Sequence, residues 1–329
     1  MLFALFPHLI SNQHRLPQTA LILLYFWILF NVFAIGMLVL DLLVFHRRSR
    51  VVRSRDALAF SAIWIALAAA FAGILFYWQG RQIALEFVTG YVLELSLSVD
   101  NLFLFLVIFR YFSVPEEHQR KVLFWGILGA LLMRGIFILA GVGLIERFHW
   151  VLYLFGALLI YSGIRLGFSG EHQVDPAKNP VVRALRRLIR VTDDFQGGRF
   201  FVRGWKGNPG LYATPLLIVL AVIETTDLLF AVDSIPAVLA VTLNAFIVYT
   251  ANVFAILGLR SMYFAVSKLM KIFRFLHTGL AFILILVGLK MIAADYYRVP
   301  TVLTLGVIAL VLLISIAASL AFRPKSASP

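Results

Sequence analysis

The sequence predicts an all-α, polytopic membrane protein with about nine transmembrane helices, including an inverted repeat of three plus three helices. Composition carries this fold class, because 62% of the 329 residues are hydrophobic, only 14% are charged and the mean hydropathy is +0.94. An average soluble domain has about 45–50% apolar and about 25% charged residues. The apolar residues also form long runs, each close to the roughly 20 residues that cross a bilayer. A soluble globular fold is therefore excluded.

The apolar runs divide the chain into predicted segments. The spanning runs cover about residues 20–45, 57–77, 84–111, 121–145, 150–167, 210–242, 246–268, 275–294 and 300–322. The segments are an extracytoplasmic N-terminal stretch (1–19), two N-terminal helices (20–83), a first three-helix repeat (84–167), a cytoplasmic basic loop (168–209), a second three-helix repeat (210–294) and a last helix with a cytoplasmic tail (295–329). A basic start and a cleavage site are missing before the first run, so we expect its helix to serve as an uncleaved signal.

Basic residues predict the orientation in the membrane. The chain has 29 Lys and Arg against 16 Asp and Glu, and most loop cations lie after the first, third, fifth and seventh runs and in the tail. Such loops stay in the cytoplasm, which places the N-terminus outside and the C-terminus inside. This rule explains the positive charge without a nucleic-acid partner. We expect residues 181–190 to form a basic amphipathic helix on the anionic lipids of the inner leaflet.

Two parts of the sequence resemble each other. Residues 98–101 match 231–234 in their Val-Asp-polar centre, and residues 126–134 align with 252–260 so that both stretches end in arginine. The third to fifth runs therefore correspond to the sixth to eighth, and a copy displaced by three spans crosses the membrane in the opposite sense. Inverted repeats of this kind place the substrate of a transporter at the midplane between the two halves.

Acidic residues occur at unusual depth in the predicted spans. Five lie deep in the third and sixth runs, which are the first spans of the two repeat halves: Glu94, Asp100, Glu224, Asp227 and Asp233. Each ionised acid at the bilayer centre costs about 2.5–3.5 kcal/mol, so five facing lipid would cost roughly 12–17 kcal/mol. The cations well inside spans are two arginines, Arg134 and Arg260, which leaves the acids in excess. We therefore predict a cation site made by the acids, with the arginines as charge partners or gates.

The donor types narrow the ion that such a site would take. Neutral oxygens near the acids could come from five residues: Ser98, Asn101, Thr226, Ser234 and Asn252. The chain has no cysteine, and its seven histidines fall in loops or near span ends, so Zn²⁺ and Cu⁺ are poorly served. Oxygen ligands suit Mn²⁺, Mg²⁺ or Ca²⁺, and the residues do not distinguish these three ions.

The spacing of the acids predicts interrupted helices. Glu94 and Asp100 are six residues apart, as are Asp227 and Asp233, and six residues of an intact helix turn by about 600°, which points the two acids about 120° apart. We therefore expect an unwound segment at 96–101 and a second break near Pro236, as in the discontinuous helices of transporters.

Longer strings at these positions resemble a known family. Thr89-Gly-Tyr-Val-Leu-Glu94 followed by 98–101, and the acidic string 224–237, are similar to the two signature motifs of the TerC family. Residues 201–203, 211–215, 252–260 and 262–264 resemble its Alx branch, and the likeness runs from about 41 to 321. The resemblance implies a bacterial inner-membrane protein associated with manganese efflux or, in some members, with tellurite resistance. It also implies that the five deep acids are the metal-site residues.

The leading hypothesis is a secondary transporter, not an enzyme, that exports a divalent cation from the cytoplasm by alternating access. Mn²⁺ is its first candidate substrate, protons are the expected exchange partner, and no resident cofactor is expected. One alternative is a non-transporting membrane subunit of a tellurite or metal stress-resistance complex, with 168–209 as its docking surface. Another is an intramembrane aspartyl hydrolase using Asp100 and Asp233, although five acids exceed what a two-carboxylate pair needs. The sequence indicates no particular protein partner.

Overall fold

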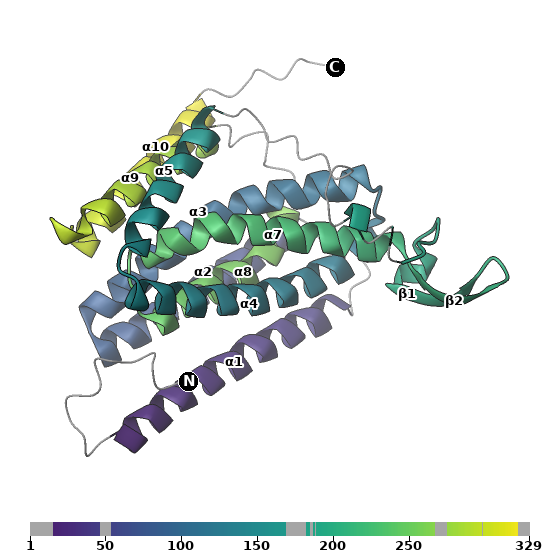
Figure 1. The fold of residues 1–329 in the computed structure, drawn as a ribbon, viewed down its shortest axis with the longest axis horizontal. Coiled ribbons are helices and arrows are strands. Elements are labelled where there is room, and N and C mark those ends of the chain that lie inside the picture. Colours follow the sequence, from purple (N-terminus) through teal and green to yellow (C-terminus); the bar gives the residue numbers. More distant parts are fainter. Residues whose placement is uncertain are drawn as a thin grey trace.

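The computed structural model describes residues 16–46, 54–168, 182–184, 187, 189–266, 275–297 and 299–321. For residues 16–24, 41–46, 54–58, 99, 100, 103 and 259–266 within these ranges it describes the backbone only. The long helices are α1 (Leu16–His46), α2 (Ser54–Gln79), α3 (Arg81–Tyr111), α4 (Glu116–Arg147), α5 (Val151–Phe168), α7 (Pro215–Leu239), α8 (Ala245–Val266), α9 (Leu276–Ile292) and α10 (Thr301–Ala321). Strands β1 (Phe201–Trp205) and β2 (Asn208–Ala213) form a hairpin that projects beside the start of α7 (Figure 1).

The helices confirm the predicted class of polytopic, all-helical membrane protein. In the described part of the chain, six helical segments are long and apolar enough to cross a membrane: Ala59–Gln79, Glu116–Arg147, Val151–Phe168, Pro215–Leu239, Leu276–Asp295 and Thr301–Ala321. Two shorter apolar helices cover Tyr25–Leu40 and Ala245–Gly258. Helix α3 has 31 residues and carries Glu94 and Asp100. The count of nine spans stays a prediction.

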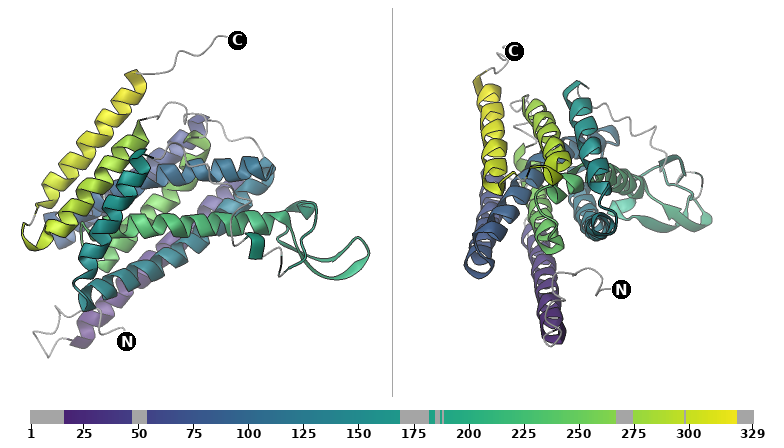
Figure 2. Two further views of the ribbon diagram at one scale, coloured as in Figure 1. Left: turned by 45° about the horizontal axis from the view of Figure 1, so that its top comes forward. Right: turned by 60° about the vertical axis from the view of Figure 1, so that its left-hand side comes forward.

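The central helices pair across the two predicted halves. Helix α3 packs on α8 and α4 packs on α7, while α2 covers α3 and α8. Helices α5, α9 and α10 lie side by side and cross the central helices at an angle (Figures 1 and 2). Exchanging α3, α4 and α5 for α7, α8 and α9 converts the α3–α8 pair into the α7–α4 pair and retains the α5–α9 pair. This is the pairing that a two-fold relation between the halves produces, and the repeat itself stays a prediction.

Glycines allow α5 and α9 to approach closely. A Cβ atom added to Gly288 would lie 2.7 Å from the carbonyl oxygen of Gly156, and one added to Gly156 would lie 3.0 Å from the carbonyl oxygen of Gly288. Further along, a Cβ at Gly163 would lie 2.7 Å from the carbonyl oxygen of Ala281. Small residues permit such contact between helices in lipid. The contacts advance along α5 as they recede along α9, so the two helices run antiparallel.

The two predicted helix breaks are wrong. Helix α3 is continuous through 96–101, where the Ser96 hydroxyl donates to the Val92 carbonyl of the preceding turn at 2.6 Å. Helix α7 continues past Pro236 to Leu239. The proline lies in the last turn of α7, so its missing N–H removes a hydrogen bond only where the helix is about to end.

The predicted start of the sixth span at 210 is also wrong. Residues 208–213 form strand β2, and α7 begins at Pro215, a residue suited to the first helical turn. Lys206 and Gly207 form the two-residue turn of the hairpin with φ of 49° and 81°, the left-handed pair that a type I′ turn requires. The amphipathic helix predicted at 181–190 lies largely outside the described residues, which include only 182–184, 187, 189 and 190 of it.

Candidate cation site

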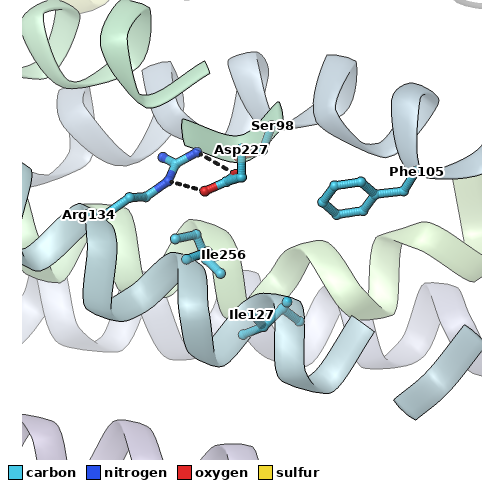
Figure 3. Close-up of a pocket in the computed structure, with 8 residues that line it drawn as sticks. Ser98, Phe105, Ile127, Arg134, Asp227 and Ile256 are labelled. Carbon is cyan, nitrogen blue, oxygen red and sulfur yellow. Dashed lines mark hydrogen bonds and ion pairs between the residues drawn. The ribbon is translucent and has the colours of Figure 1, made fainter. Parts of the chain in front are cut away.

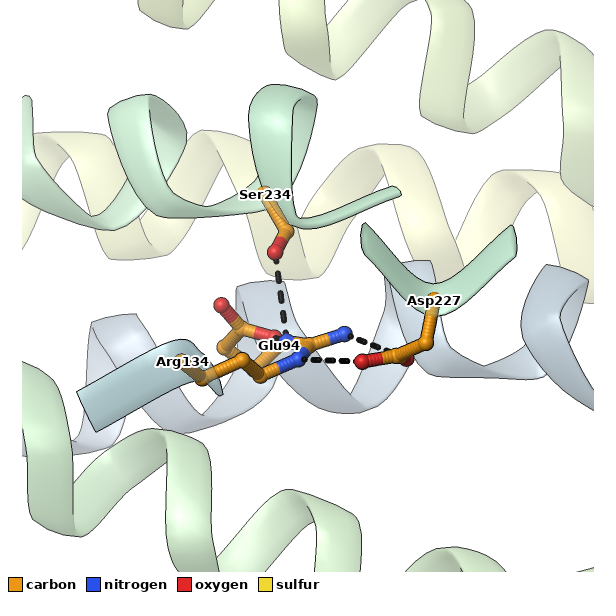
Figure 4. Close-up of polar contacts among 4 residues, drawn as sticks. All are labelled: Glu94, Arg134, Asp227 and Ser234. Carbon is orange, nitrogen blue, oxygen red and sulfur yellow. Dashed lines mark hydrogen bonds and ion pairs between the residues drawn. The ribbon is translucent and has the colours of Figure 1, made fainter. Parts of the chain in front are cut away.

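Arg134 of α4 lies at the centre of a buried ion-pair network (Figure 4). Its Nη1 donates to Glu94 Oε2 of α3 at 2.8 Å, and its Nη2 and Nε donate to the two carboxylate oxygens of Asp227 of α7 at 3.2 and 3.3 Å. Nη1 also donates to Ser234 Oγ at 3.2 Å. Arg134 and Glu94 are each 1% exposed and Asp227 is 5% exposed. The network therefore joins three helices inside the protein.

Helix periodicity explains why these side chains meet. Asp227 and Ser234 are seven residues apart on α7, so they share one face two turns apart. At a rise of 1.5 Å per residue, Glu94 lies about 20 Å from the start of α3 and Asp227 about 18 Å from the start of α7, within the roughly 30 Å of a hydrocarbon core. Glu94 and Asp227 each lie six residues before the aspartate of the matched stretches 98–101 and 231–234. The predicted repeat would therefore make them equivalent acids, which Arg134 joins.

The charge of the network is not balanced when all its groups are ionised. One guanidinium faces two carboxylates, and Glu94 Oε1 is buried without a hydrogen-bond partner among the described atoms. A buried ion pair is tolerated when its geometry is good, whereas removal of one partner costs about 3–5 kcal/mol. The site can therefore hold one positive charge in its interior and retains capacity for more.

A small cavity adjoins this network (Figure 3). It is lined by Ser98, Phe105, Gly126, Ile127, Ala130, Arg134, Asp227 and Ile256. Its volume is about 10 Å³, which is close to the volume needed for one water-sized sphere. A hydrated divalent ion does not fit, so the site is closed in this conformation.

Further polar atoms near the centre of the described helices lack partners. Ser98 Oγ, Tyr91 Oη and both amide atoms of Asn252 are buried without a hydrogen bond to the described protein atoms. Ser98 lies one turn after Glu94 on α3, and Asn252 lies one turn before Ile256, a residue of the cavity wall. Each unpaired buried polar group costs about 1–3 kcal/mol. The oxygen atoms among them are neutral ligands of the kind that hard cations take, and Ser98 lines the same cavity as Asp227.

Among the predicted site residues with described side chains, Asp233 and Thr226 bind groups other than Arg134. Asp233 accepts a hydrogen bond from Ser162 Oγ of α5 at 2.6 Å, on a different face of α7 from Asp227. Thr226 donates to the Val222 carbonyl of its own helix at 2.7 Å, and Asn101 is buried. Among the side chains that the structure describes, no three His, Asp or Glu residues form a ready ligand group. The predicted site residues Asp100 and Arg260 lie outside the described side chains.

Glu224 occupies a separate position beside α4. It is half-buried, and a Cβ atom at Gly129 would collide with its carboxylate. Sequence reasoning missed Gly129 as a neighbour of Glu224 and Ser162 as the partner of Asp233. Ser162 stands before Gly-Ile-Arg165, which resembles Gly-Leu-Lys290 in the other predicted half, so it had a signal in the sequence. The role of a glycine depends on which side chain faces it.

Comparison with known proteins agrees with this architecture. The family described as integral membrane protein TerC family matches residues 79–327. The chain is 46% identical over 294 residues to membrane protein STKORF319 of Myxococcus xanthus, covering 89% of this chain and 91% of that protein. It is 44% identical over 292 residues to Alx of Escherichia coli strain K12, described as a proposed membrane-bound redox modulator, covering 86% and 90%. A membrane protein of Rickettsia bellii is 36% identical over 293 residues, covering 89% and 96%. No solved structure matches the chain. This chain belongs to the TerC family of integral membrane proteins.

Proposed function

We propose that this protein is a secondary transporter that moves a divalent cation, first of all Mn²⁺, out of the cytoplasm in exchange for protons. The observation that carries the proposal is Arg134, which is 1% exposed and ion-paired with Glu94 and Asp227. Acids at this depth in a membrane are costly, and intramembrane ionisable groups mark ion and proton pathways. The depth of Glu94 and Asp227 therefore supports a cation as the substrate.

The donor chemistry supports an oxygen-preferring ion as cargo. Carboxylates of Glu94 and Asp227 stand near the hydroxyl of Ser98, and the chain contains no cysteine. Such donors suit Mn²⁺ and Mg²⁺ better than soft ions. Arg134 is the tethered cation that holds the acids in the closed conformation, and the substrate ion replaces part of its contacts when the site opens.

Coupling to protons follows from charge balance. The acids that bind a divalent ion must be neutralised again when that ion leaves, and protons or the guanidinium supply the positive charge. Inverted halves that rock about a central site provide alternating access without moving the ion through lipid.

The first test is uptake of Mn²⁺ into everted membrane vesicles with an imposed pH gradient. Uptake should exceed that of vesicles without the protein, should fall about tenfold or more in Asp227→Asn and Glu94→Gln, and should collapse when an ionophore removes the gradient. Mg²⁺ and Ca²⁺ are added as competitors to establish selectivity. Glu116→Gln, an exposed acid at the start of α4, is the matched control.

Two results would overturn the proposal. One is wild-type uptake no faster than that of empty vesicles. The other is unchanged uptake in Asp227→Asn at an equal amount of membrane-inserted protein. Cells that lose metal resistance when the protein is deleted, together with vesicles that contain the protein and take up no Mn²⁺, would favour the non-transporting subunit.

The description of the Alx relatives supports a second candidate, a redox-modulating role. The absence of cysteine from the sequence means that such a role would use no thiol of this chain. Redox modulation would then act through ion movement or through a partner. If cells with Asp227→Asn showed the same redox state as cells with the wild-type protein but no longer exported the ion, this role would be separate from transport.

A further inference from the structure

Glu224 differs from the other described acids of the centre. The described contacts of Arg134 are with Glu94, Asp227 and Ser234, so the guanidinium does not bind Glu224. Its Oε2 atom is buried without a hydrogen-bond partner in the described structure. Glu224 precedes Asp227 by three residues, which places it on nearly the same face of α7. The Glu224 carboxylate can therefore move or change its ligand without breaking the Arg134 network.

Gly129 of α4 makes the space for this carboxylate. A Cβ atom at position 129 would meet Oε1, Cδ and Oε2 of Glu224. One turn earlier, a Cβ at Gly126 would meet the apolar Ile223 Cγ2 at 3.2 Å instead. Glycine inside a helix costs about 1 kcal/mol relative to alanine, so a glycine at mid-helix has a packing reason. Here the group packed against it is an acid.

We infer that Gly129 is a positioning residue: the notch that it leaves in α4 holds the carboxylate of Glu224 in place, while Arg134 holds Glu94 and Asp227. That the positioned carboxylate serves cation binding rests on the proposed function. The notch itself rests on the packing of α4 against α7. Any side chain at 129 would displace the carboxylate.

A chemical test reads the position of Glu224 without transport. The full chain in lipid vesicles is treated with dicyclohexylcarbodiimide, which modifies protonated carboxyl groups in apolar surroundings, and the modified residues are located by peptide mass spectrometry. Glu224 should be modified in preference to Glu94 and Asp227. Gly129→Ala should lower the modification of Glu224 about tenfold, because the alanine displaces the carboxylate and a site group must be held within about 0.5 Å.

The matched control lies on the same pair of helices. A Cβ at Gly141 of α4 would lie 3.0 Å from Leu239 Cδ1 of α7, the flexible end of an apolar side chain. Gly141→Ala should therefore leave the modification of Glu224 unchanged. An equal effect of both alanines would show general loosening of the α4–α7 contact and would overturn the inference.

Rescue separates positioning from folding. Glu224→Asp shortens the side chain by one methylene, so Gly129→Ala/Glu224→Asp should recover both the folded amount and part of the Mn²⁺ uptake. In a Glu224→Gln background Gly129→Ala should lower uptake no further, since coupled residues are non-additive. If the double variant with aspartate is as poorly folded as Gly129→Ala, the clash is not with Glu224 and the inference fails.

The two proposals fail in different ways. Modification of Glu224 that depends on Gly129, together with no uptake by the wild type, supports the positioning role and rejects transport. Normal uptake together with modification that is unaffected by Gly129→Ala rejects the positioning role and supports transport.

Discussion

At the scale of single residues, Arg134 has a double role. It neutralises acids that would be unstable alone in the membrane, and it occupies the place where a substrate cation would meet Glu94 and Asp227. Its guanidinium binds Asp227 through two nitrogens in a planar fork, an arrangement that lysine cannot reproduce. Stability and transport thus depend on the same contacts.

Substitution of Arg134 should lower stability in a graded order. Arg134→Met leaves two carboxylates without a cation and should destabilise the protein by about 3–5 kcal/mol, while Arg134→Lys retains the charge and should cost less. Thermal unfolding of the purified chain in detergent, followed by tryptophan fluorescence, measures this order. Arg110→Lys, at an exposed position near the end of α3, should unfold like the wild type.

A second substitution tests the cause. Asp227→Asn in the Arg134→Met background removes one of the two unpaired charges and should recover part of the lost stability. An unfolding midpoint of Arg134→Met equal to that of the wild type would mean that the ion pairs contribute nothing to the fold.

At the scale of helices, α5 and α9 bring their backbones into contact at glycines. The backbones of Gly156 and Gly288 face each other, so neither position has room for a side chain. In lipid the hydrophobic effect does not drive helices together, and close backbone packing replaces it. We expect α5 and α9 to move as one unit when the central helices rearrange.

Alanine at Gly288 should therefore weaken this unit. Its Cβ would lie 2.7 Å from a backbone oxygen that cannot move aside, and overpacking of this kind costs about 1–3 kcal/mol. Gly167→Ala is the control in the same interface, because its Cβ would lie 3.5 Å from the Ala281 Cβ, an ordinary contact. The thermal midpoint should fall for Gly288→Ala and not for Gly167→Ala. Equal thermal midpoints for the two variants would show that the α5–α9 contact accommodates a side chain at 288 without loss of stability.

At the scale of the whole molecule, the charge distribution and the fold give one testable topology. The segment just before the hairpin adjoins the start of α4, where Lys121 Nζ donates to the Gly198 carbonyl at 2.7 Å. The turn between α4 and α5 contains the exposed Trp150 at the other end of α4. The positive-inside rule predicts that the hairpin lies in the cytoplasm and this turn outside.

Single cysteines can test that topology because the natural chain has none. Lys206→Cys, in the exposed hairpin turn, should react with a membrane-impermeant maleimide in everted vesicles and not in intact cells. Trp150→Cys should react in intact cells. Labelling of both positions from the same side would contradict the topology, and the cysteine-free parent shows the background.

Much of the architecture was predictable because lipid imposes strict rules on sequence. A long apolar run in a bilayer must form a helix, since its backbone groups have no other hydrogen-bond partners there. Hence the predicted runs at 121–145, 150–167 and 300–322 correspond to α4, α5 and α10. The same reasoning failed at 210–213, where the predicted start of a span belongs to strand β2, which follows the hairpin turn.

The site was predictable in its residue types and less so in its arrangement. The depth of Glu94, Asp227 and Arg134 in their spans already required charge pairing, and the structure joins these three. Asp233 has the same depth, yet it bonds to Ser162 of α5 because six residues turn an intact helix to another face. The predicted breaks assumed that all five acids had to meet one ion, an assumption that the continuous helices remove.

Composition and order alone decided that the chain is a helical membrane protein with charged groups buried in its spans. Those properties follow from the free energy of transfer into lipid, which depends on residue type and position along the chain. Tertiary packing decided that Arg134 joins Glu94 to Asp227, that Asp233 turns toward α5, and that Gly129 faces Glu224. Which side chains meet depends on how helices far apart in sequence pack together, and that is set by the shape of whole helix faces and not by any local pattern.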